Sequence, residues 1–314
     1  MTCEKIYLYE GRDDVTLTTY IQDDYPELMN GRKRGAILVC PGGGYFYCSD
    51  REGEPAALAF AAQGYDTFVL RYSVFNHNRG RNTMENIVPD PSKPWESNGG
   101  EPHPGPVRDI GRALQYIKEH ADEWLIDMNK VALCGFSAGA HNCAMYCVHY
   151  NKPMITEYLG LDEPIRPAAA IISYTLSDFR IVMAKPDHPT ADMWYGFMKS
   201  YFGDNEITEE LLDELSPCLQ VTEDTPPMFI WTTAGDEAVP NDHSLKLAMA
   251  LNEKKVPYEI HIFEEGQHGL CLATQESASG AGQIRPDVAP WISLADTWLK
   301  KRIASEFTNE IVGF

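Results

Sequence analysis

The sequence lacks the features that mark membrane, secreted or nucleic-acid-binding proteins. No stretch approaches the roughly 18–20 consecutive apolar residues of a membrane-spanning helix, and the first residues do not join a basic region to an apolar one. Basic residues are scarce, because 26 Lys and Arg stand against 46 Asp and Glu, for a formal net charge of −20. Such a charge disfavours nucleic acid or an anionic membrane as a partner. We therefore expect a cytoplasmic protein with no membrane and no nucleic-acid partner.

Cysteine pairs with metal-binding spacing are also missing. The eight cysteines are scattered, several lie within apolar segments, and no C-x-x-C pair occurs. Cys143 and Cys147 lie one helical turn apart, a spacing that could suit a metal, but core packing is the commoner use of such residues. No cluster of histidines and carboxylates suggests a metal either. The pattern indicates reduced, buried thiols, and it predicts neither a metal nor a cofactor.

What the sequence does contain is the composition of an ordinary globular protein. Its 314 residues are 44% hydrophobic and 23% charged, which is enough for a substantial core. No internal repeat, low-complexity tract or linker divides the chain. We therefore expect a single domain over residues 1–314.

The most informative stretch follows the apolar run 131–134. Residues 135–139 read G-F-S-A-G, and helix-forming residues come next. A strand that runs into G-x-S-x-G and then a helix is typical of a sharp turn that projects a serine hydroxyl above a sheet. The turn is so tight that Gly135 and Gly139 must lack Cβ atoms. Ser137 is therefore a candidate nucleophile.

A second glycine-rich loop follows an earlier buried-type strand. Residues 35–40 are continuously apolar, and residues 41–45 read P-G-G-G-Y. Such a loop is either a plain flexible connection or a set of backbone N–H groups placed to stabilise an oxyanion, as in the H-G-G-G segment of esterases. Proline replaces the histidine, but the glycine amides that the chemistry requires are intact. The N–H groups of Gly43, Gly44 and Ala138 are the predicted oxyanion hole.

The chain alternates strands and helices, which predicts an α/β fold with a mostly parallel sheet. Helical patterns cover about 54–63, 107–124, 142–147, 241–254 and 290–306. The predicted strands are 4–9, 15–21, 35–40, 66–72, 131–134, 167–174, 227–233 and 258–263.

Two long insertions break this alternation. Residues 73–106 are rich in proline, and residues 175–225 have helical patterns around 190–201 and 208–215. Long loops in compact domains are often functional. The aromatic residues of the second insertion could form a lid over the site or belong to the core; they are Trp194, Tyr195, Phe197, Tyr201 and Phe202.

A serine nucleophile needs a base, and His268 is the best-placed histidine. It follows the last predicted strand and has Gly266 and Gly269 on either side, so it should lie at the carboxyl edge of the sheet beside Ser137. His141 follows the serine too closely and should pack near the start of a helix. Six further histidines lie in the insertions, on helices or within a strand: His77, His103, His120, His149, His188 and His261.

The base in turn needs a carboxylate to fix its tautomer. Asp236 follows the predicted strand 227–233, and His268 follows the next predicted strand, 258–263. Neighbouring strands are only about 5 Å apart, so the two loops can touch. Glu237 is the competitor, but its side chain should alternate away from the site. Serine, aspartate and histidine then occur in the chain order that α/β-hydrolases use.

With these motifs in place, the chain resembles an α/β-hydrolase esterase from about residue 35 to 300. More narrowly, residues 225–231 and 257–269 resemble the bacterial acetyl xylan esterase-like carbohydrate esterases. That group often has two aspartates where this chain has Gly235 and Asp236, so Asp236 is the sole aspartate for the role. The resemblance implies the α/β-hydrolase fold, with about eight strands and helices on both faces.

The resemblance also implies removal of acetyl or other short acyl groups from carbohydrate such as xylan oligosaccharides. The partner would be a small-molecule or oligosaccharide ester. Three alternatives stay open: a general short-chain carboxylesterase or lipase-like esterase, a serine peptidase, and a hydrolase-fold binding protein without catalysis.

Overall fold

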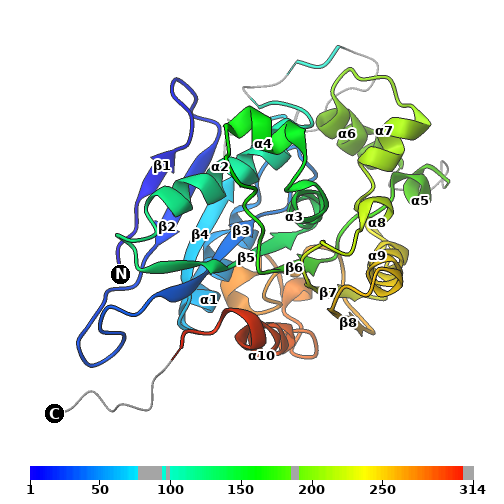
Figure 1. Cartoon of the computed structure of the whole chain (residues 1–314). Coiled ribbons are helices and arrows are strands. Elements are labelled where there is room, and N and C mark those ends of the chain that lie inside the picture. Colours follow the sequence, from blue (N-terminus) through cyan, green and yellow to red (C-terminus); the bar gives the residue numbers. More distant parts are fainter. Residues whose placement is uncertain (77–93, 97–99, 185–190, 307–314) are drawn as a thin grey trace.

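The computed structural model describes residues 1–76, 94–96, 100–184 and 191–306 (Figure 1). Within these residues the chain forms one eight-stranded sheet in the order β1-β2-β4-β3-β5-β6-β7-β8. Strand β2 runs antiparallel to both of its neighbours, β1 and β4, and the remaining neighbouring pairs are parallel. The strands are β1 Lys5–Tyr7, β2 Thr16–Tyr20, β3 Arg34–Cys40, β4 Asp66–Arg71, β5 Ile126–Phe136, β6 Ala169–Ser173, β7 Met228–Thr233 and β8 Tyr258–Phe263.

Helices cover both faces of this sheet (Figure 1). In the described residues they are α1 Glu54–Ala61, α2 Gly105–Glu119, α3 Ala138–His149, α4 Pro153–Leu159, α5 Phe179–Met183, α6 Ala191–Phe202, α7 Glu209–Glu214, α8 Pro217–Gln220, α9 Asp242–Glu253 and α10 Trp291–Ile303, with short 3-10 turns η1 Asp50–Glu52, η2 Gln275–Ser277 and η3 Ala281–Gln283. The predicted mostly parallel sheet of about eight strands with helices on both faces is confirmed.

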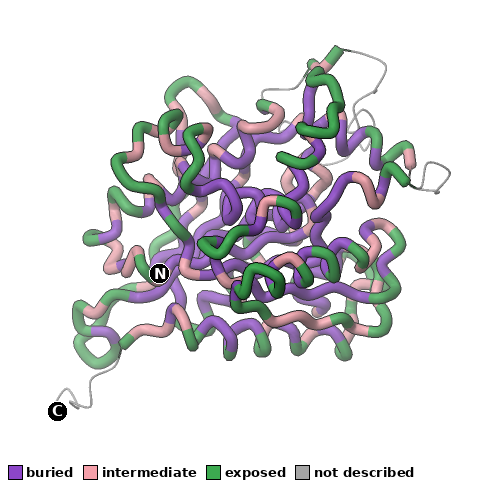
Figure 2. Tube along the Cα trace, turned by 45° about the vertical axis from the view of Figure 1, so that its right-hand side comes forward, coloured by how far each residue is buried: buried purple, intermediate pink, exposed green. Residues whose placement is uncertain are grey.

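The central strands are buried (Figure 2). Their side chains alternate between two cores, one on each face of the sheet. In β3, Ala36 and Leu38 pack on the side of α2, α3 and α9, whereas Ile37 and Val39 pack on the side of α1 and α10. Since both faces need apolar side chains, these strands appear in the sequence as unbroken apolar runs.

The pairing register brings the functional loops together at one edge of the sheet. Cys40 at the end of β3 pairs with Gly135 in β5, so the glycine loop begins beside the serine turn. Thr233 at the end of β7 pairs with Phe263 at the end of β8, so the loops carrying Asp236 and His268 start side by side. Thr233 Oγ1 also donates to the Gly266 carbonyl at 2.7 Å, which ties these two loops to each other.

The second insertion, residues 175–225, has more structure than its sequence predicts. Its helices α6 and α7 match the predicted segments, and the short helices α5 and α8 were not predicted. Most of the first insertion lies outside the described residues. No helix among the residues that the structure describes has both the length and the apolar character to cross a bilayer.

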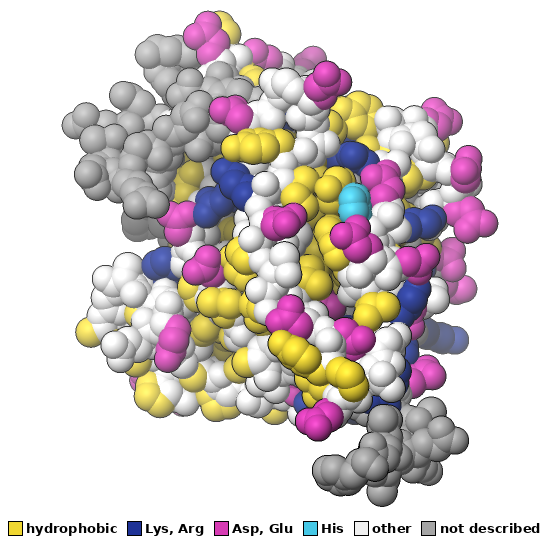
Figure 3. Space-filling model, turned by 90° about the vertical axis from the view of Figure 1, so that its left-hand side faces the viewer, with side chains coloured by type: hydrophobic (Ala, Val, Ile, Leu, Met, Phe, Trp, Pro, Cys, Tyr) yellow, Lys and Arg dark blue, Asp and Glu magenta, His cyan; other side chains and the backbone are white. Residues whose placement is uncertain are grey.

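The surface and the thiols agree with the composition. Acidic side chains are spread over the face shown in Figure 3 instead of gathering in one patch. All eight cysteines are free thiols, and six of them are buried. Cys143 and Cys147 pack in the core on α3, as predicted.

Candidate active site

Ser137 occupies the single residue between β5 and α3. Its backbone has φ 51° and ψ −118°, a conformation that residues other than glycine rarely adopt. The backbone is crowded around it: a Cβ on Gly139 would lie 2.1 Å from the Cys40 carbonyl oxygen. A Cβ on Gly135 would lie 2.4 Å from the Gly139 carbonyl oxygen. The predicted need for glycine at both positions is therefore confirmed.

A continuous chain of hydrogen bonds joins the three predicted side chains. Ser137 Oγ lies 2.8 Å from His268 Nε2, and His268 Nδ1 lies 2.7 Å from Asp236 Oδ2. Because the carboxylate oxygen only accepts, Nδ1 must carry the hydrogen, and the lone pair of Nε2 then faces the serine hydroxyl. In this geometry His268 is placed to remove the proton of Ser137.

The Asp236 carboxylate is held by backbone N–H groups of residues that follow it in the chain. Its Oδ1 accepts the N–H groups of Ala238 at 3.0 Å and Val239 at 2.8 Å, and its side chain is only 1% exposed. Glu237, the competing carboxylate, is exposed to solvent. The structure thus pairs His268 with Asp236 and leaves Glu237 at the surface.

The pKa of His268 reflects two opposing effects. Burial lowers this pKa, but the charge and hydrogen bond of Asp236, with a smaller contribution from Glu52, stabilise the imidazolium. The net pKa is raised above the ordinary value of 6.5. The histidine is consequently a stronger base than a free imidazole.

The three predicted oxyanion-hole residues, Gly43, Gly44 and Ala138, line one cavity together with Ser137. Ala138 is the first residue of α3, so its N–H has no partner within the helix. Gly43 has φ 124°, which favours glycine, and its carbonyl accepts the Phe46 N–H at 3.0 Å. The loop is therefore an ordered turn, and the plain flexible connection considered above does not describe it.

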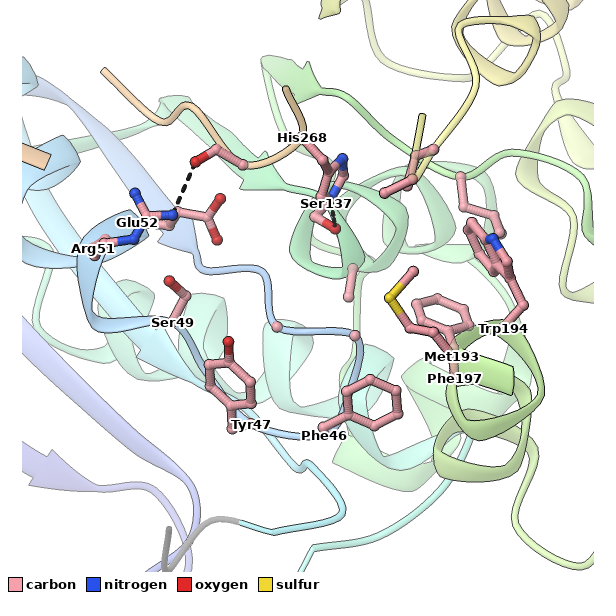
Figure 4. A pocket seen from close by; sticks show the side chains of 17 residues that line it. Phe46, Tyr47, Ser49, Arg51, Glu52, Ser137, Met193, Trp194, Phe197 and His268 are labelled. Atoms are coloured by element: carbon pink, nitrogen blue, oxygen red, sulfur yellow. Dashed lines mark hydrogen bonds between the residues drawn. The ribbon is translucent and has the colours of Figure 1, made fainter. Parts of the chain in front are cut away.

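The cavity has a volume of about 350 Å³ and two chemically different sides (Figure 4). Ser137 and His268 lie between these sides. We call the polar wall Tyr47, Ser49, Arg51 and Glu52. We call the apolar wall Phe46, Leu176, Met193, Trp194, Phe197 and Val239.

Hydrogen bonds hold two members of the polar wall, Arg51 and Glu52, in place. The Arg51 guanidinium donates to the carbonyls of Gly269 at 2.9 Å and Ser277 at 2.7 Å. Glu52, only 3% exposed, accepts the Gly42 N–H at 3.0 Å and the Tyr174 hydroxyl at 2.7 Å. These contacts join η1 to the glycine loop and to the loop that follows His268.

The aromatic residues of the second insertion, which the sequence places either over the site or in the core, are found in both environments. Trp194 and Phe197 line the cavity, whereas Tyr201 and Phe202 are buried in the core. Tyr195 is 45% exposed. The group therefore divides between site and core, and α6 carries both kinds of residue.

His141 packs at the start of α3, as predicted. It is fully buried; its Nε2 donates to the Leu215 carbonyl and its Nδ1 accepts from the Tyr45 hydroxyl, both at 2.9 Å. Burial lowers the pKa of His141 to about 3, so the ring is neutral. The contact joins the glycine loop, where Tyr45 lies, to the helix that starts at Ala138.

The other described histidines form hydrogen bonds elsewhere: His103 with Tyr201, His120 with Tyr116, His149 with Glu214, His243 with Ser177 and His261 with Glu259. His77 and His188 lie outside the described residues. Within the described residues, no group of three or more His, Cys, Asp or Glu side chains is arranged to hold a metal ion.

Sequence reasoning missed Arg51, Glu52 and Tyr174. Glu52 and Tyr174 are hydrogen-bonded although they lie 122 positions apart in the sequence, and neither belongs to a recognised motif. The one local signal is that Arg51 and Glu52 closely follow the glycine loop.

Solved structures of known proteins share this architecture over nearly the whole chain. A carboxylesterase from Lactobacillus plantarum WCFS1 matches with a TM-score of 0.75 and 27% identity, over 96% of this chain and 98% of the other. An acetyl ester-xyloside bifunctional hydrolase from Caldicellulosiruptor lactoaceticus matches with a TM-score of 0.71 and 27% identity, over 95% and 96% of the two chains. The sheet, the serine turn and these neighbours define an α/β-hydrolase fold.

The family can be stated more narrowly. The BD-FAE family matches residues 95–251, half of the chain. The chain belongs to the BD-FAE family. A curated relative, the endo-1,4-beta-xylanase B of Butyrivibrio fibrisolvens, is 35% identical over 250 residues, which are 79% of this chain and 34% of the relative. The chain spans about a third to a half of the length of the curated relatives that it matches.

Proposed function

We propose that this chain is a serine carboxylic-ester hydrolase that works by two-step acyl transfer. Ser137 Oγ forms a bond to the ester carbonyl carbon while its proton passes to His268 Nε2. The N–H groups of Gly43, Gly44 and Ala138 receive the negative charge that develops on the carbonyl oxygen. As the bond to the alcohol breaks, His268 gives the proton to the leaving oxygen, and the acyl group stays on Ser137.

The second step repeats the first with water as the nucleophile. Water attacks the acyl carbonyl and passes a proton to His268. The bond to Ser137 Oγ then breaks, the carboxylic acid leaves, and the serine regains its proton. Asp236 keeps Nδ1 protonated and stabilises the imidazolium in both steps.

One observation carries this proposal: the unbroken hydrogen-bond chain from Ser137 Oγ through His268 to Asp236, in the cavity that Gly43, Gly44 and Ala138 line. A binding protein without catalysis has no need for this alignment. The strained backbone of Ser137 is an added cost that the same function explains.

We further propose that the substrate is an acetyl or other short acyl ester of a carbohydrate, such as a xylan oligosaccharide. The names of the xylanase and acetyl ester-xyloside relatives point to this class. The cavity supports it, because the polar wall offers hydrogen-bonding groups to a hydroxyl-rich alcohol and the apolar wall suits an acyl group.

A second candidate is a general short-chain carboxylesterase. The apolar wall favours it, since six apolar side chains enclose more space than an acetyl methyl group needs. The two candidates differ in what the alcohol contributes. A carbohydrate esterase gains rate from the sugar, whereas a general esterase depends mainly on the acyl group.

A hydrolysis screen tests both. Purified protein is assayed with acetylated xylo-oligosaccharides, nitrophenyl acetate, nitrophenyl butyrate and a peptide nitroanilide, with Ser137→Ala as the blank. We expect hydrolysis of the acetylated sugars with the highest kcat/KM and none of the nitroanilide. Hydrolysis of nitrophenyl esters alone would favour the general esterase, and cleavage of the nitroanilide alone would contradict the proposal.

A further inference from the structure

Glu52 is a buried carboxylate beside the triad that the proposed mechanism does not use. It lies in η1, away from the three sequence motifs, yet it lines the catalytic cavity at 3% exposure. A buried carboxylate is costly unless hydrogen bonds compensate it. Its partners therefore indicate what it is retained for.

Both carboxylate oxygens act as acceptors. One takes the Gly42 N–H at 3.0 Å and the other takes the Tyr174 hydroxyl at 2.7 Å. The Tyr174 oxygen in turn accepts the Cys271 N–H at 3.1 Å, so the single hydroxyl hydrogen is free to point at Glu52. The donors come from the glycine loop, the end of β6 and the loop after His268.

The same tyrosine contacts the catalytic base. The ring of Tyr174 meets the ring of His268 edge to face, with centroids 5.1 Å apart. Tyr174 itself has φ 38°, an unfavourable conformation that its surroundings must hold in place. Glu52 is thus joined to the glycine loop directly and to His268 through Tyr174.

We infer that Glu52 is a positioning residue. Its carboxylate fixes the position of the oxyanion-hole loop relative to the His268 loop, on either side of Ser137. The inference rests on the proposed function, because it assigns Glu52 a role in the same reaction. Misplacing reacting groups by about 1 Å can cost about 10²-fold in rate, so such a tie has a measurable value.

The negative charge of Glu52 has a second effect, on the base itself. Asp236 and Tyr174 contact His268, Glu52 acts on it through its charge, and Arg51 lines the same cavity. Among them, Asp236 contributes most to raising the pKa of His268 and Glu52 adds to it. Replacing Glu52 with a neutral side chain should therefore lower this pKa, whereas a purely structural role would leave it in place.

Two matched variants separate the tie from the charge. Glu52→Gln keeps the shape and one acceptor but removes the charge. Tyr174→Phe removes the hydroxyl that Glu52 binds but leaves the charge near His268. The readout is the pH dependence of the rate at which a fluorophosphonate labels Ser137, since this reaction needs the triad and the amides but no particular ester.

We expect both variants to label about ten- to a hundredfold more slowly than wild type at the plateau. Only Glu52→Gln should shift the acidic limb of the profile to lower pH. Thermal unfolding of each variant checks that the fold is intact. A Glu52→Gln profile that superimposes on wild type in both height and position would overturn the inference while leaving the esterase proposal in place. A wild-type protein that does not label at all would instead contradict the proposed function.

Discussion

The two walls of the catalytic cavity are built by different physical means. The polar wall lies close to the glycine loop in sequence. Arg51 donates to two backbone carbonyls and Glu52 accepts a backbone N–H, which hold this wall in place. The apolar wall comes largely from the second insertion, where Trp194 and Phe197 of α6 pack against each other with ring centroids 5.5 Å apart. Directional bonds set one wall, and non-directional packing sets the other.

This difference suggests a division of labour. Hydrogen bonds define positions within tenths of an ångström, which suits groups that align a reaction. Packing tolerates changes of size and shape, which suits groups that select a substrate. We therefore expect changes on the polar side and in the triad to alter the rate for every ester, and changes in the apolar wall to alter the preference among esters.

The largest effect should come from the triad, which both walls share. Asp236→Asn keeps the size of the side chain but no longer requires a hydrogen on His268 Nδ1, so kcat should fall about 10⁴-fold. Glu237→Gln, the neighbouring exposed position, should leave kcat unchanged. Steady-state kinetics on an acetyl and a butyryl ester should show the same loss for both; a loss confined to one ester would break the comparison.

A smaller effect should come from the contact that holds the glycine loop against α3. Tyr45→Phe leaves the buried Nδ1 of His141 without a donor, which should lower the free energy of unfolding by about 1–3 kcal/mol. Tyr25→Phe, at an exposed position, serves as the control and should change it little. Denaturant unfolding measures both. An unchanged stability for Tyr45→Phe would mean that the loop does not depend on this bond.

The apolar wall should control acyl preference. A butyryl group has two more methylenes than acetyl, and burying each is worth about 0.8 kcal/mol, so full contact favours butyrate by roughly 15-fold in kcat/KM. Trp194→Ala removes much of this contact and should bring the butyrate-to-acetate ratio towards one.

Tyr195→Ala provides the matched control, because Tyr195 is the next residue on α6 and points to solvent. Its ratio should equal that of wild type. If Trp194→Ala leaves the butyrate-to-acetate ratio of kcat/KM at the wild-type value, the acyl group does not reach this wall.

The pH profile should show the subtlest effect, a displacement of one limb. The reactive form of His268 is neutral, and the charge of Asp236 raises its pKa above the ordinary value of 6.5 against the effect of burial. The acidic limb of kcat/KM should therefore lie above pH 6.5, and activity should fall about tenfold per pH unit below it. A limb below pH 6.5, measured where the protein stays folded, would contradict this account.

Much of this site can be predicted from sequence because its parts are local motifs at strand ends. The G-x-S-x-G turn, the glycine loop and the two glycines around His268 each predict a particular backbone conformation. Parallel strands bring their carboxyl ends to the same edge of the sheet. The choice of Asp236 over Glu237 follows from the same reasoning, and the hydrogen bond to His268 agrees with it.

The rest could not be predicted because it depends on packing between distant segments. Nothing local to Glu52 indicates that it will bond Tyr174, and nothing in the α6 pattern separates Trp194 from Tyr201. Helices α5 and α8 span only 5 and 4 residues, too short to give a periodic signal. Tertiary contacts decide all three cases.

The most direct test of the account is to locate the covalent adduct. The protein is treated with a fluorophosphonate to completion, and the modified peptide is identified by mass spectrometry while ester hydrolysis is followed in parallel. We predict a single adduct on Ser137, loss of hydrolysis in proportion to labelling, and no adduct in Ser137→Ala. Hydrolysis that persists in fully labelled protein, or an activity-abolishing adduct on another residue, would contradict the assignment of Ser137 as the nucleophile.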